Sequence, residues 1–165
     1  MTNIREDGKA MNILFICTGN TCRSPMAKAL FLKRLQEIGV APETESFQIF
    51  SAGLSARDDL AASPQAIAVM GEEGVDISVH RSVHLRTNSV LEADLILTMT
   101  TGQRDYIKAN YPERADSIYT LSEYTGDEAG EVLDPYGQDI NAYRQSLVQL
   151  KILVDRLINR IIESK

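Results

Sequence analysis

The sequence has few cysteines and no long apolar segment. Cys17 and Cys22 are the only two cysteines among 165 residues, and both lie near the start of the chain. Two cysteines are too few for the disulfide framework of a secreted protein, so thiol chemistry in a reducing compartment is the better interpretation. No apolar run approaches the roughly 20 residues that cross a bilayer, and the first ten residues are polar, unlike a signal peptide. We therefore expect a soluble, cytoplasmic protein that does not act at a membrane.

The sequence also lacks a cluster of Lys and Arg residues. It has 17 Lys and Arg against 23 Asp and Glu, which gives a formal net charge of −6. Binding to a nucleic-acid backbone depends on concentrated positive charge, so a nucleic-acid partner is not expected. A small local anion site remains compatible with this composition, and we expect the chain to act as a monomer.

One domain is expected after a short extension. The first ten residues are rich in charge and have no apolar periodicity, which predicts a flexible N-terminal extension over residues 1–10. Residues 11–165 have the length of a single globular domain, and the whole chain has an ordinary composition of 44% hydrophobic and 24% charged residues. No linker, internal repeat or low-complexity tract divides this domain.

Short apolar runs alternate with helical patterns along the domain. The run NILFIC over residues 12–17 is continuously apolar, which is typical of a strand buried on both faces of a parallel sheet. A loop follows, and apolar residues at helical spacing then predict a helix that ends near Gly39. The run FQIFSAG over residues 47–53 predicts a second strand, and Ser63-Pro64 marks the start of a second helix.

The alternation continues in the second half of the domain. Residues 75–85 are expected to form a loop, and residues 91–99 a short helical turn followed by a third strand. A helix is expected over residues 102–110, a short fourth strand over residues 117–121, and one long closing helix over residues 141–162. This order predicts the α/β class, a doubly wound three-layer sandwich in which helices flank a parallel sheet.

The first strand-to-helix junction has the pattern of an anion site. Cys17 ends the first predicted strand, and Arg23 and Ser24 begin the next helix, in the order C-T-G-N-T-C-R-S. A loop of this length before a helix can turn its backbone N–H groups inward as a nest for a tetrahedral oxyanion. The Arg23 guanidinium would complete the nest with bidentate hydrogen bonds. The candidate binding residues are Thr18, Gly19, Asn20, Thr21, Cys22 and Ser24.

The same surroundings suit a reactive sulfur. A helix N-terminus favours the thiolate form of Cys17, and the Ser24 hydroxyl can donate a hydrogen bond to it. Thiolate, anion nest and Arg23 together suit phosphoryl transfer, in which positioning and charge stabilisation supply most of the rate. The alternative is a buried strand cysteine and a solvated arginine, because a Cys-x5-Arg spacing alone also occurs by chance. The Cys-x5-Arg segment lies at the first strand-to-helix turn, where α/β folds bind anions, and this position favours the functional interpretation.

Phosphoryl transfer also needs an acid that protonates the leaving group. Asp134, in V-L-D-P-Y-G, is the candidate. The proline after it restricts its backbone to an extended geometry, which projects the carboxylate from a stiff loop. An ordinary Asp-Pro turn is the alternative, and the presence of the cysteine loop favours the acid.

Taken together, these motifs resemble the low-molecular-weight protein tyrosine phosphatase family. The loop C-T-G-N-T-C-R-S-P-M-A, the S-A-G over residues 51–53 and the late D-P-Y carry the resemblance, which runs from about Met11 to the C-terminus. The family implies a four-stranded parallel sheet, phosphorylated protein substrates, and no metal or cofactor. It also implies Cys17 as nucleophile, Arg23 as phosphate clamp and Asp134 as general acid.

The resemblance further implies residues that support the phosphate loop. Asn20, Ser51 and His80 match the polar network that shapes this loop in the family, and Tyr136 belongs to the D-P-Y motif. A surface loop histidine is the alternative for His80, and His84 is expected to be structural. Neither histidine is the expected catalytic base.

Two positions and one loop differ from many tyrosine-specific members. Thr21 stands where many of them have an aliphatic residue, Gly137 stands where a second bulky residue follows Asp-Pro-Tyr, and the loop LSARDDLAAS lacks an aromatic wall. The pattern resembles the bacterial protein arginine phosphatase branch, which implies hydrolysis of phosphoarginine in proteins. The Thr21 hydroxyl would lie near the phosphoramidate, Asp134 would meet the guanidinium, and Gly137 would leave room for it. Phosphotyrosine is the alternative substrate, with Thr21 only packing and Gly137 only turning.

Two other classes of function agree less well with the sequence. Thiol-dependent arsenate reductases share this fold and loop but use further cysteines downstream, and none follows Cys22. A non-catalytic phosphoprotein-binding module needs an anion nest, but not a thiol and an acid together. Cys22 itself has two interpretations: a small buried residue, or the partner of Cys17 in a reversible disulfide that protects the nucleophile from over-oxidation.

Overall fold

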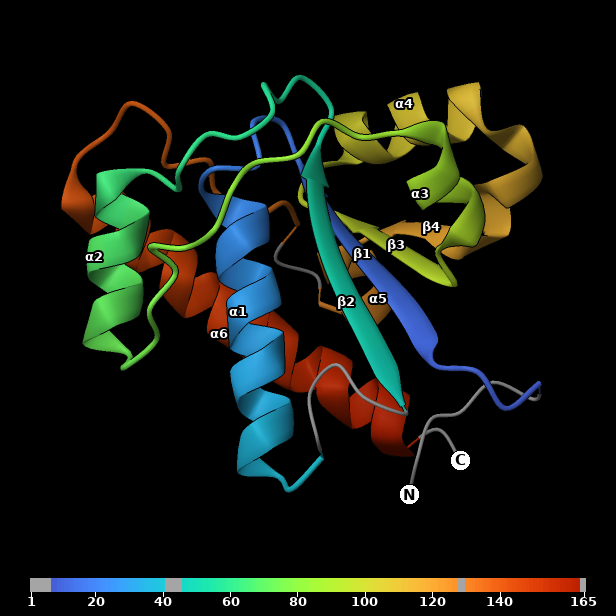
Figure 1. The fold of residues 1–165 in the computed structure, drawn as a ribbon, viewed down its shortest axis with the longest axis horizontal. Helices are drawn as coiled ribbons and strands as arrows, with labels where there is room; N and C mark the ends of the chain where they lie inside the picture. Colours follow the sequence, from blue (N-terminus) through green and yellow to red (C-terminus); the bar gives the residue numbers. More distant parts are fainter. Residues whose placement is uncertain (1–6, 41–45, 128–129, 164–165) are drawn as a thin grey trace.

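The computed structural model describes residues 7–40, 46–127 and 130–163 (Figure 1). Most of the predicted extension, residues 1–6, lies outside the described residues. Residues 7–10 lead directly into the first strand.

A four-stranded sheet forms the centre of the domain, with all neighbouring strands parallel and in the order β2-β1-β3-β4. The strands are β1 (Met11–Cys17), β2 (Phe47–Gly53), β3 (Leu95–Thr98) and β4 (Ile118–Thr120). The central strand β1 is buried over residues 13–17, which is why its sequence is continuously apolar. The predicted parallel sheet is therefore confirmed.

Helices cover both faces of this sheet, as the doubly wound prediction requires (Figure 1). On one side lie α1 (Arg23–Glu37), α2 (Pro64–Glu72), α5 (Leu121–Thr125) and α6 (Ile140–Glu163). On the other side lie α3 (Thr87–Glu92) and α4 (Thr101–Asn110). Successive side chains of β1 divide between the two layers, with Ile13 and Phe15 in the first core and Leu14 and Ile16 in the second.

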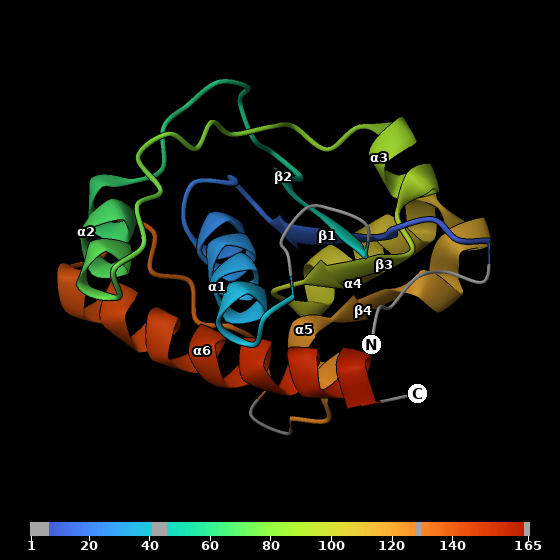
Figure 2. The ribbon, with the colours of Figure 1, turned by 60° about the horizontal axis from the view of Figure 1, so that its bottom comes forward.

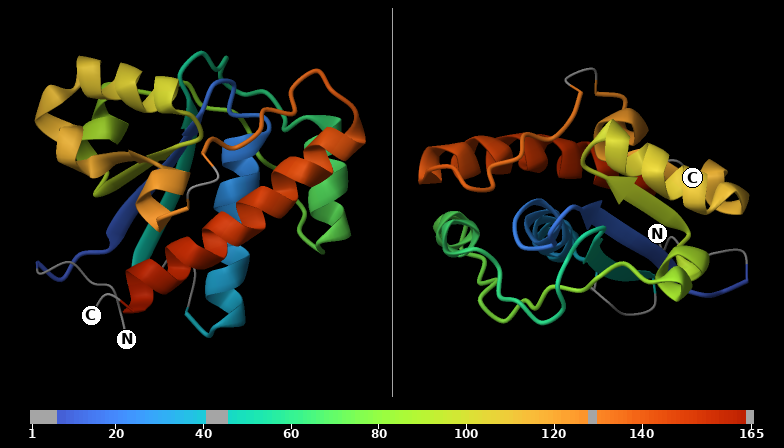
Figure 3. Two further views of the ribbon diagram at one scale, coloured as in Figure 1. Left: turned by 180° about the vertical axis from the view of Figure 1, so that it is seen from behind. Right: turned by 90° about the horizontal axis from the view of Figure 1, so that it is seen from above.

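The long helix α6 closes the larger of the two cores. It runs beneath α1, α2 and α5 (Figure 2) and crosses α1 on the back of the domain (Figure 3). Its apolar stripe is buried, as the helical spacing predicts. The buried residues of the predicted stripe are Leu147, Leu150, Val154, Leu157 and Ile161.

Two short helical segments were not predicted: α5 and the 3-10 helix Pro112–Ser117. Both are too short to show apolar periodicity in the sequence. Leu121, predicted as the end of the fourth strand, instead begins α5, because the Thr120 hydroxyl caps that helix by accepting a 3.0 Å hydrogen bond from the Glu123 N–H.

Candidate functional site

The loop over residues 17–23, here called the Cys17 loop, lies at the carboxyl end of the sheet. β1 and β2 pair in parallel up to Cys17 and Gly53, so the loops that follow them meet at one edge (Figure 1). A Cβ on Gly53 would lie 2.6 Å from the Thr18 carbonyl oxygen and 2.9 Å from the Asn20 amide nitrogen. Only glycine permits this close approach, which explains the last residue of the S-A-G motif.

Asn20 holds the Cys17 loop in shape. It is fully buried, with a φ of 55° that asparagine tolerates better than most residues. Its Nδ2 donates to Ser24 Oγ at 2.8 Å and to Ser51 Oγ at 3.0 Å, and its Oδ1 accepts from the Val83 N–H at 2.9 Å. His80 Nε2 lies 2.8 Å from the Asn20 carbonyl oxygen. The three predicted support residues therefore meet, and Val83, which was not predicted, joins them.

His80 is a neutral hydrogen-bond donor at this position. Burial lowers its pKa below the usual 6.5, the hydrogen bond to Asn20 opposes this shift, and the positive charges of Lys28 and Arg81 lower the pKa further. Since a carbonyl oxygen can only accept, the proton of the neutral ring is on Nε2.

The sulfur of Cys17 is buried inside the loop and faces two donors. Ser24 Oγ lies 2.9 Å from Cys17 Sγ, and the Asn20 backbone N–H donates to the same sulfur at 3.2 Å. Because Ser24 Oγ already accepts a hydrogen bond from Asn20 Nδ2, its own hydrogen can be directed at the sulfur. Donors arranged in this way stabilise a thiolate.

Arg23, at the end of the Cys17 loop, forms an ion pair with Asp134, with 3.4 Å between Arg23 Nη2 and Asp134 Oδ2. The Arg23 side chain is only 4% exposed, whereas that of Asp134 is 55% exposed. Arg23 Nη1 also donates to the Val132 carbonyl at 3.3 Å, and Asp134 Oδ1 accepts from the Tyr136 N–H at 3.1 Å. The guanidinium is therefore fixed inside the site, and the carboxylate stands at its mouth.

The segment that carries Asp134 is tied to the rest of the domain from both sides. The Val132 N–H donates to the Met99 carbonyl at the end of β3, at 3.0 Å. Ser146 Oγ of α6 donates to the Leu133 carbonyl at 2.7 Å. These bonds place a residue from late in the chain opposite the loop that follows the first strand.

A cavity of about 260 Å³ brings most of the predicted site residues together. The predicted residues that line it are Cys17, Thr18, Gly19, Thr21, Cys22, Arg23, Asp134 and Tyr136. The loop after β2 completes the wall with Ser55, Ala56, Arg57 and Leu60. The other predicted residues, Asn20, Ser24, Ser51 and His80, are outside the cavity lining and support the loop through the hydrogen bonds described above.

Thr21 and Gly137, the two positions that differ from tyrosine-specific relatives, have different surroundings. Thr21 lines the cavity, with Oγ1 3.7 Å from Cys22 Sγ. Gly137 is not part of the lining, its φ is 74°, and a Cβ there would meet no described atom within 4 Å. The positive φ of the turn by itself favours glycine at this position, and the role of Gly137 in leaving room for a leaving group stays a prediction.

Cys22 is buried against α6. Its sulfur lies 3.3 Å from Tyr143 Oη and 3.6 Å from Ser63 Oγ, and both cysteines are free thiols. Burial raises the pKa of Tyr143 to about 12, and its hydrogen bond with Cys22 acts in the same direction. Tyr143 is therefore a neutral phenol that packs behind the Cys17 loop. No local sequence motif predicts this contact between Cys22 and Tyr143, which are far apart in the chain.

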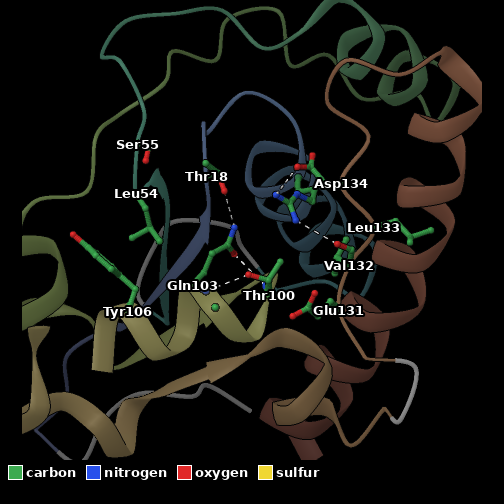
Figure 4. Close-up of a pocket in the computed structure, with 12 residues that line it drawn as sticks. Thr18, Leu54, Ser55, Thr100, Gln103, Tyr106, Glu131, Val132, Leu133 and Asp134 are labelled. Atoms are coloured by element: carbon green, nitrogen blue, oxygen red, sulfur yellow. Dashed lines mark hydrogen bonds and ion pairs between the residues drawn. The ribbon is translucent and has the colours of Figure 1, made fainter. Parts of the chain in front are cut away.

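A second cavity, of about 630 Å³, continues from the first and shares Thr18, Arg23, Ser55 and Asp134 with it. We call it the α4 trough. Its remaining lining residues are Leu54, Thr100, Gly102, Gln103, Tyr106, Glu131, Val132 and Leu133 (Figure 4). None of these was predicted, because no sequence motif links them.

Gln103 connects the α4 trough to the Cys17 loop. Its Nε2 donates to Thr18 Oγ1 at 3.0 Å, and its Oε1 accepts from the N–H groups of Met99 at 2.9 Å and Thr100 at 3.1 Å. The Thr100 hydroxyl in turn accepts from the Gln103 N–H, which closes a capping box at the start of α4.

The described residues offer no metal site, because no group of three or more His, Cys, Asp or Glu side chains is arranged to hold an ion. Across the same ranges, no helix combines the length and apolar character needed to span a membrane.

The domain that carries this site has characterised relatives. A family model described as low molecular weight phosphotyrosine protein phosphatase matches residues 12–165. A protein-arginine-phosphatase from Geobacillus stearothermophilus is 39% identical over 149 residues, which cover 90% of this chain and 95% of that protein. A low molecular weight protein-tyrosine-phosphatase from Staphylococcus haemolyticus is 38% identical over 148 residues, 89% of this chain and 97% of that protein.

A solved structure agrees with these relatives. An arginine phosphatase with a cysteine-to-serine mutation and a phosphorylated active-site serine superposes on this chain with a TM-score of 0.85, at 34% sequence identity. The match covers 94% of this chain and 98% of that one. The chain therefore belongs to the low molecular weight phosphotyrosine protein phosphatase family.

Proposed function

We propose that this chain hydrolyses phosphoarginine in proteins through a cysteinyl-phosphate intermediate. In this proposal Cys17 is the nucleophile, Arg23 holds the phosphoryl group and Asp134 is the general acid. One observation carries it: Cys17 Sγ has Ser24 Oγ at 2.9 Å and the Asn20 N–H at 3.2 Å, in a cavity also lined by Arg23 and Asp134. The solved arginine phosphatase with a phosphorylated serine in place of a cysteine supports the covalent intermediate.

In the first step the Cys17 thiolate attacks phosphorus, and an S–P bond forms as the P–N bond of phosphoarginine breaks. Asp134 donates its proton to the departing guanidine nitrogen. Arg23 and the inward N–H groups of the loop stabilise the charge on the phosphoryl oxygens.

In the second step water attacks the phosphorus of the intermediate. The Asp134 carboxylate accepts a proton from this water, the S–P bond breaks, and inorganic phosphate leaves. The electron pair returns to Cys17 Sγ as a thiolate, which the Ser24 hydroxyl stabilises at 2.9 Å.

Two features of the cavity favour a guanidinium over a phenyl leaving group. Thr21 adds a hydroxyl to the wall, and the loop after β2 contributes no aromatic side chain to it. A leaving group with several N–H donors can form hydrogen bonds to the Thr21 hydroxyl and to the Asp134 carboxyl group, whereas a flat phenyl ring cannot. Phosphotyrosine is the second candidate, because the Tyr136 side chain also lines the cavity and one relative at 38% identity is a tyrosine phosphatase.

The proposal includes a cellular setting. Phosphorylated proteins are the substrates, and the two free thiols are consistent with a reducing, cytoplasmic compartment. Action as a monomer is part of the proposal.

The test is kcat/KM for two peptides of the same sequence, one with phosphoarginine and one with phosphotyrosine. We expect the wild-type protein to prefer phosphoarginine and the Cys17→Ser variant to be inactive on both. Thr21→Ile should shift the preference toward phosphotyrosine, because it replaces the hydroxyl of the wall by an aliphatic side chain.

The two parts of the proposal fail separately. A wild-type preference for phosphotyrosine would contradict the substrate assignment and leave the nucleophile in place. Turnover by Cys17→Ser would contradict the mechanism, and an unchanged preference in Thr21→Ile would remove that residue from the account of specificity.

A further inference from the structure

The α4 trough is continuous with the cavity that holds the reacting group. Thr18, Arg23, Ser55 and Asp134 line both. A polypeptide whose phosphorylated side chain enters the smaller cavity therefore has the larger one next to its neighbouring residues. The volume of about 630 Å³ is within the range of ligand sites, so it can accept a whole side chain.

The trough has an apolar side and an acidic side. In Figure 4 Leu54 and Tyr106 stand on one side, Gln103 and Thr100 lie between, and Glu131 stands on the other. Tyr106 is 58% exposed, so it is accessible to a ligand. Leu54 is partly buried and forms the adjoining apolar surface.

The Glu131 carboxylate is held in a fixed position. Its Oε1 accepts from the Thr101 N–H at 2.9 Å and from Thr101 Oγ1 at 2.7 Å, and Gln149 Nε2 donates to its backbone carbonyl at 2.8 Å. Within the described ranges its other oxygen, Oε2, makes no hydrogen bond. The bonds from Thr101 also lower the pKa of Glu131, so the group is ionised at neutral pH. A preplaced carboxylate costs a ligand little ordering entropy.

The charges of the trough favour a cation. Among the described residues of the lining, Arg23 is the one basic residue, and it forms an ion pair with Asp134. The charge of Arg23 also lowers the pKa of Glu131, but within the described ranges Glu131 forms no ion pair of its own. The two carboxylates thus outnumber the one guanidinium. An acidic neighbour in the substrate would meet like charge, and a basic neighbour would meet opposite charge. The aliphatic stem of Lys or Arg can also pack on apolar and aromatic surface while its head reaches a carboxylate.

We infer that the α4 trough binds a Lys or Arg side chain of the substrate protein that is close in sequence to the phosphorylated residue. Its stem packs on Leu54 and Tyr106, and its cationic head pairs with Glu131. The inference rests on the proposed function, since it requires a phosphorylated polypeptide in the neighbouring cavity.

The test uses phosphopeptides that differ at one neighbouring position, which carries Lys, norleucine or Glu and is scanned along both sides of the phosphorylated residue. At the best position we expect Lys to exceed Glu in kcat/KM by about three- to fivefold, mainly through KM, as for one exposed ion pair. Added salt should narrow this gap. Glu131→Gln keeps an oxygen for Thr101 but removes the charge, so it should remove most of the gap.

Glu113→Gln is the matched control. Glu113 is exposed on the 3-10 helix that follows the far end of α4, and this variant removes the same charge away from the trough. It should keep the full preference for Lys. Equal kcat/KM for Lys and Glu neighbours at every position, or an undiminished gap in Glu131→Gln, would overturn the inference.

The same experiment distinguishes failure of the proposed function from failure of the inference about the α4 trough. The series is made with phosphoarginine and with phosphotyrosine, so a wrong substrate residue appears as loss of turnover across one whole series. The affinity of the Cys17→Ser protein for the same peptides is measured in parallel, and a preference for Lys in binding supports the trough even where turnover fails. No preference in binding or in turnover contradicts it.

Discussion

At the scale of single residues, Gly53 connects the Cys17 loop to the neighbouring strand. Gly53→Ala would place a Cβ 2.6 Å from the Thr18 carbonyl oxygen and 2.9 Å from the Asn20 amide nitrogen. Both are backbone atoms, so the loop must shift, at a cost of about 1–3 kcal/mol. We expect a lower Tm and a loss of about tenfold or more in kcat/KM, because the donors around the sulfur move with the loop. Thermal unfolding and steady-state kinetics check this prediction.

The matched control is Gly71→Ala. Gly71 lies in α2, and a Cβ there would meet no described atom within 4 Å. Alanine in a helix is better than glycine by roughly 0.5–1 kcal/mol, so this variant should keep its activity and gain a little stability. Wild-type kinetics in Gly53→Ala would show that the close approach does not shape the site.

At the scale of elements, the loop over residues 75–85 supports the Cys17 loop through His80. Burial lowers the pKa of His80 in the folded protein, whereas the unfolded chain keeps the usual value of 6.5. The unfolded state therefore takes up its proton first as the pH falls, and the stabilisation present above pH 6.5 is lost as the pH drops through the lowered pKa. We expect the free energy of unfolding to fall from about pH 8 to about pH 5.5, a window above the usual pKa of carboxylates.

His80→Gln separates this effect from others. A glutamine amide can donate to the Asn20 carbonyl and does not titrate, so the variant should lose most of the pH dependence in that window. Denaturant unfolding at a series of pH values makes the comparison. An identical slope in the wild type and the variant would assign the effect to other groups.

The elements and site residues that could be predicted are those whose pattern is contained in one short stretch of sequence. Cys17 and Arg23 are six positions apart, so one strand-to-helix junction reveals both. Val83, Gln103 and Tyr143 reach the Cys17 loop from distant segments through single hydrogen bonds, and their own surroundings in the sequence carry no motif. Ser51 and His80 were accessible only through resemblance to a family, for the same reason.

At the scale of the whole molecule, stability depends on the core that α6 closes. Leu157 is fully buried in this core. Leu157→Ala should lower the free energy of unfolding by about 2–5 kcal/mol, because it removes buried methyl groups and leaves a cavity. Well below its Tm the variant should keep its kcat, since Leu157 itself does not line the cavity. Urea unfolding and activity at low temperature test the two parts.

Ile152→Ala provides the comparison on the same helix. Ile152 is 49% exposed, and surface changes of this kind usually stay within about 0.5 kcal/mol. A loss as large as that of Leu157→Ala would mean that the exposed face of α6 is covered in solution.

In the resting site the Asp134 carboxylate occupies the Arg23 guanidinium, so it competes with any anion that binds there. Nη2 and Oδ2 are 3.4 Å apart, so a phosphoryl group that binds as proposed must displace the carboxylate before it pairs with the guanidinium. After inorganic phosphate departs and Asp134 releases the proton that it accepted from water, its carboxylate is tethered beside Arg23 at a high effective concentration and can take the place of the phosphate. In the proposed mechanism, substrate arrival thus frees Asp134 to face the leaving group, and the return of Asp134 to Arg23 opposes rebinding of the product.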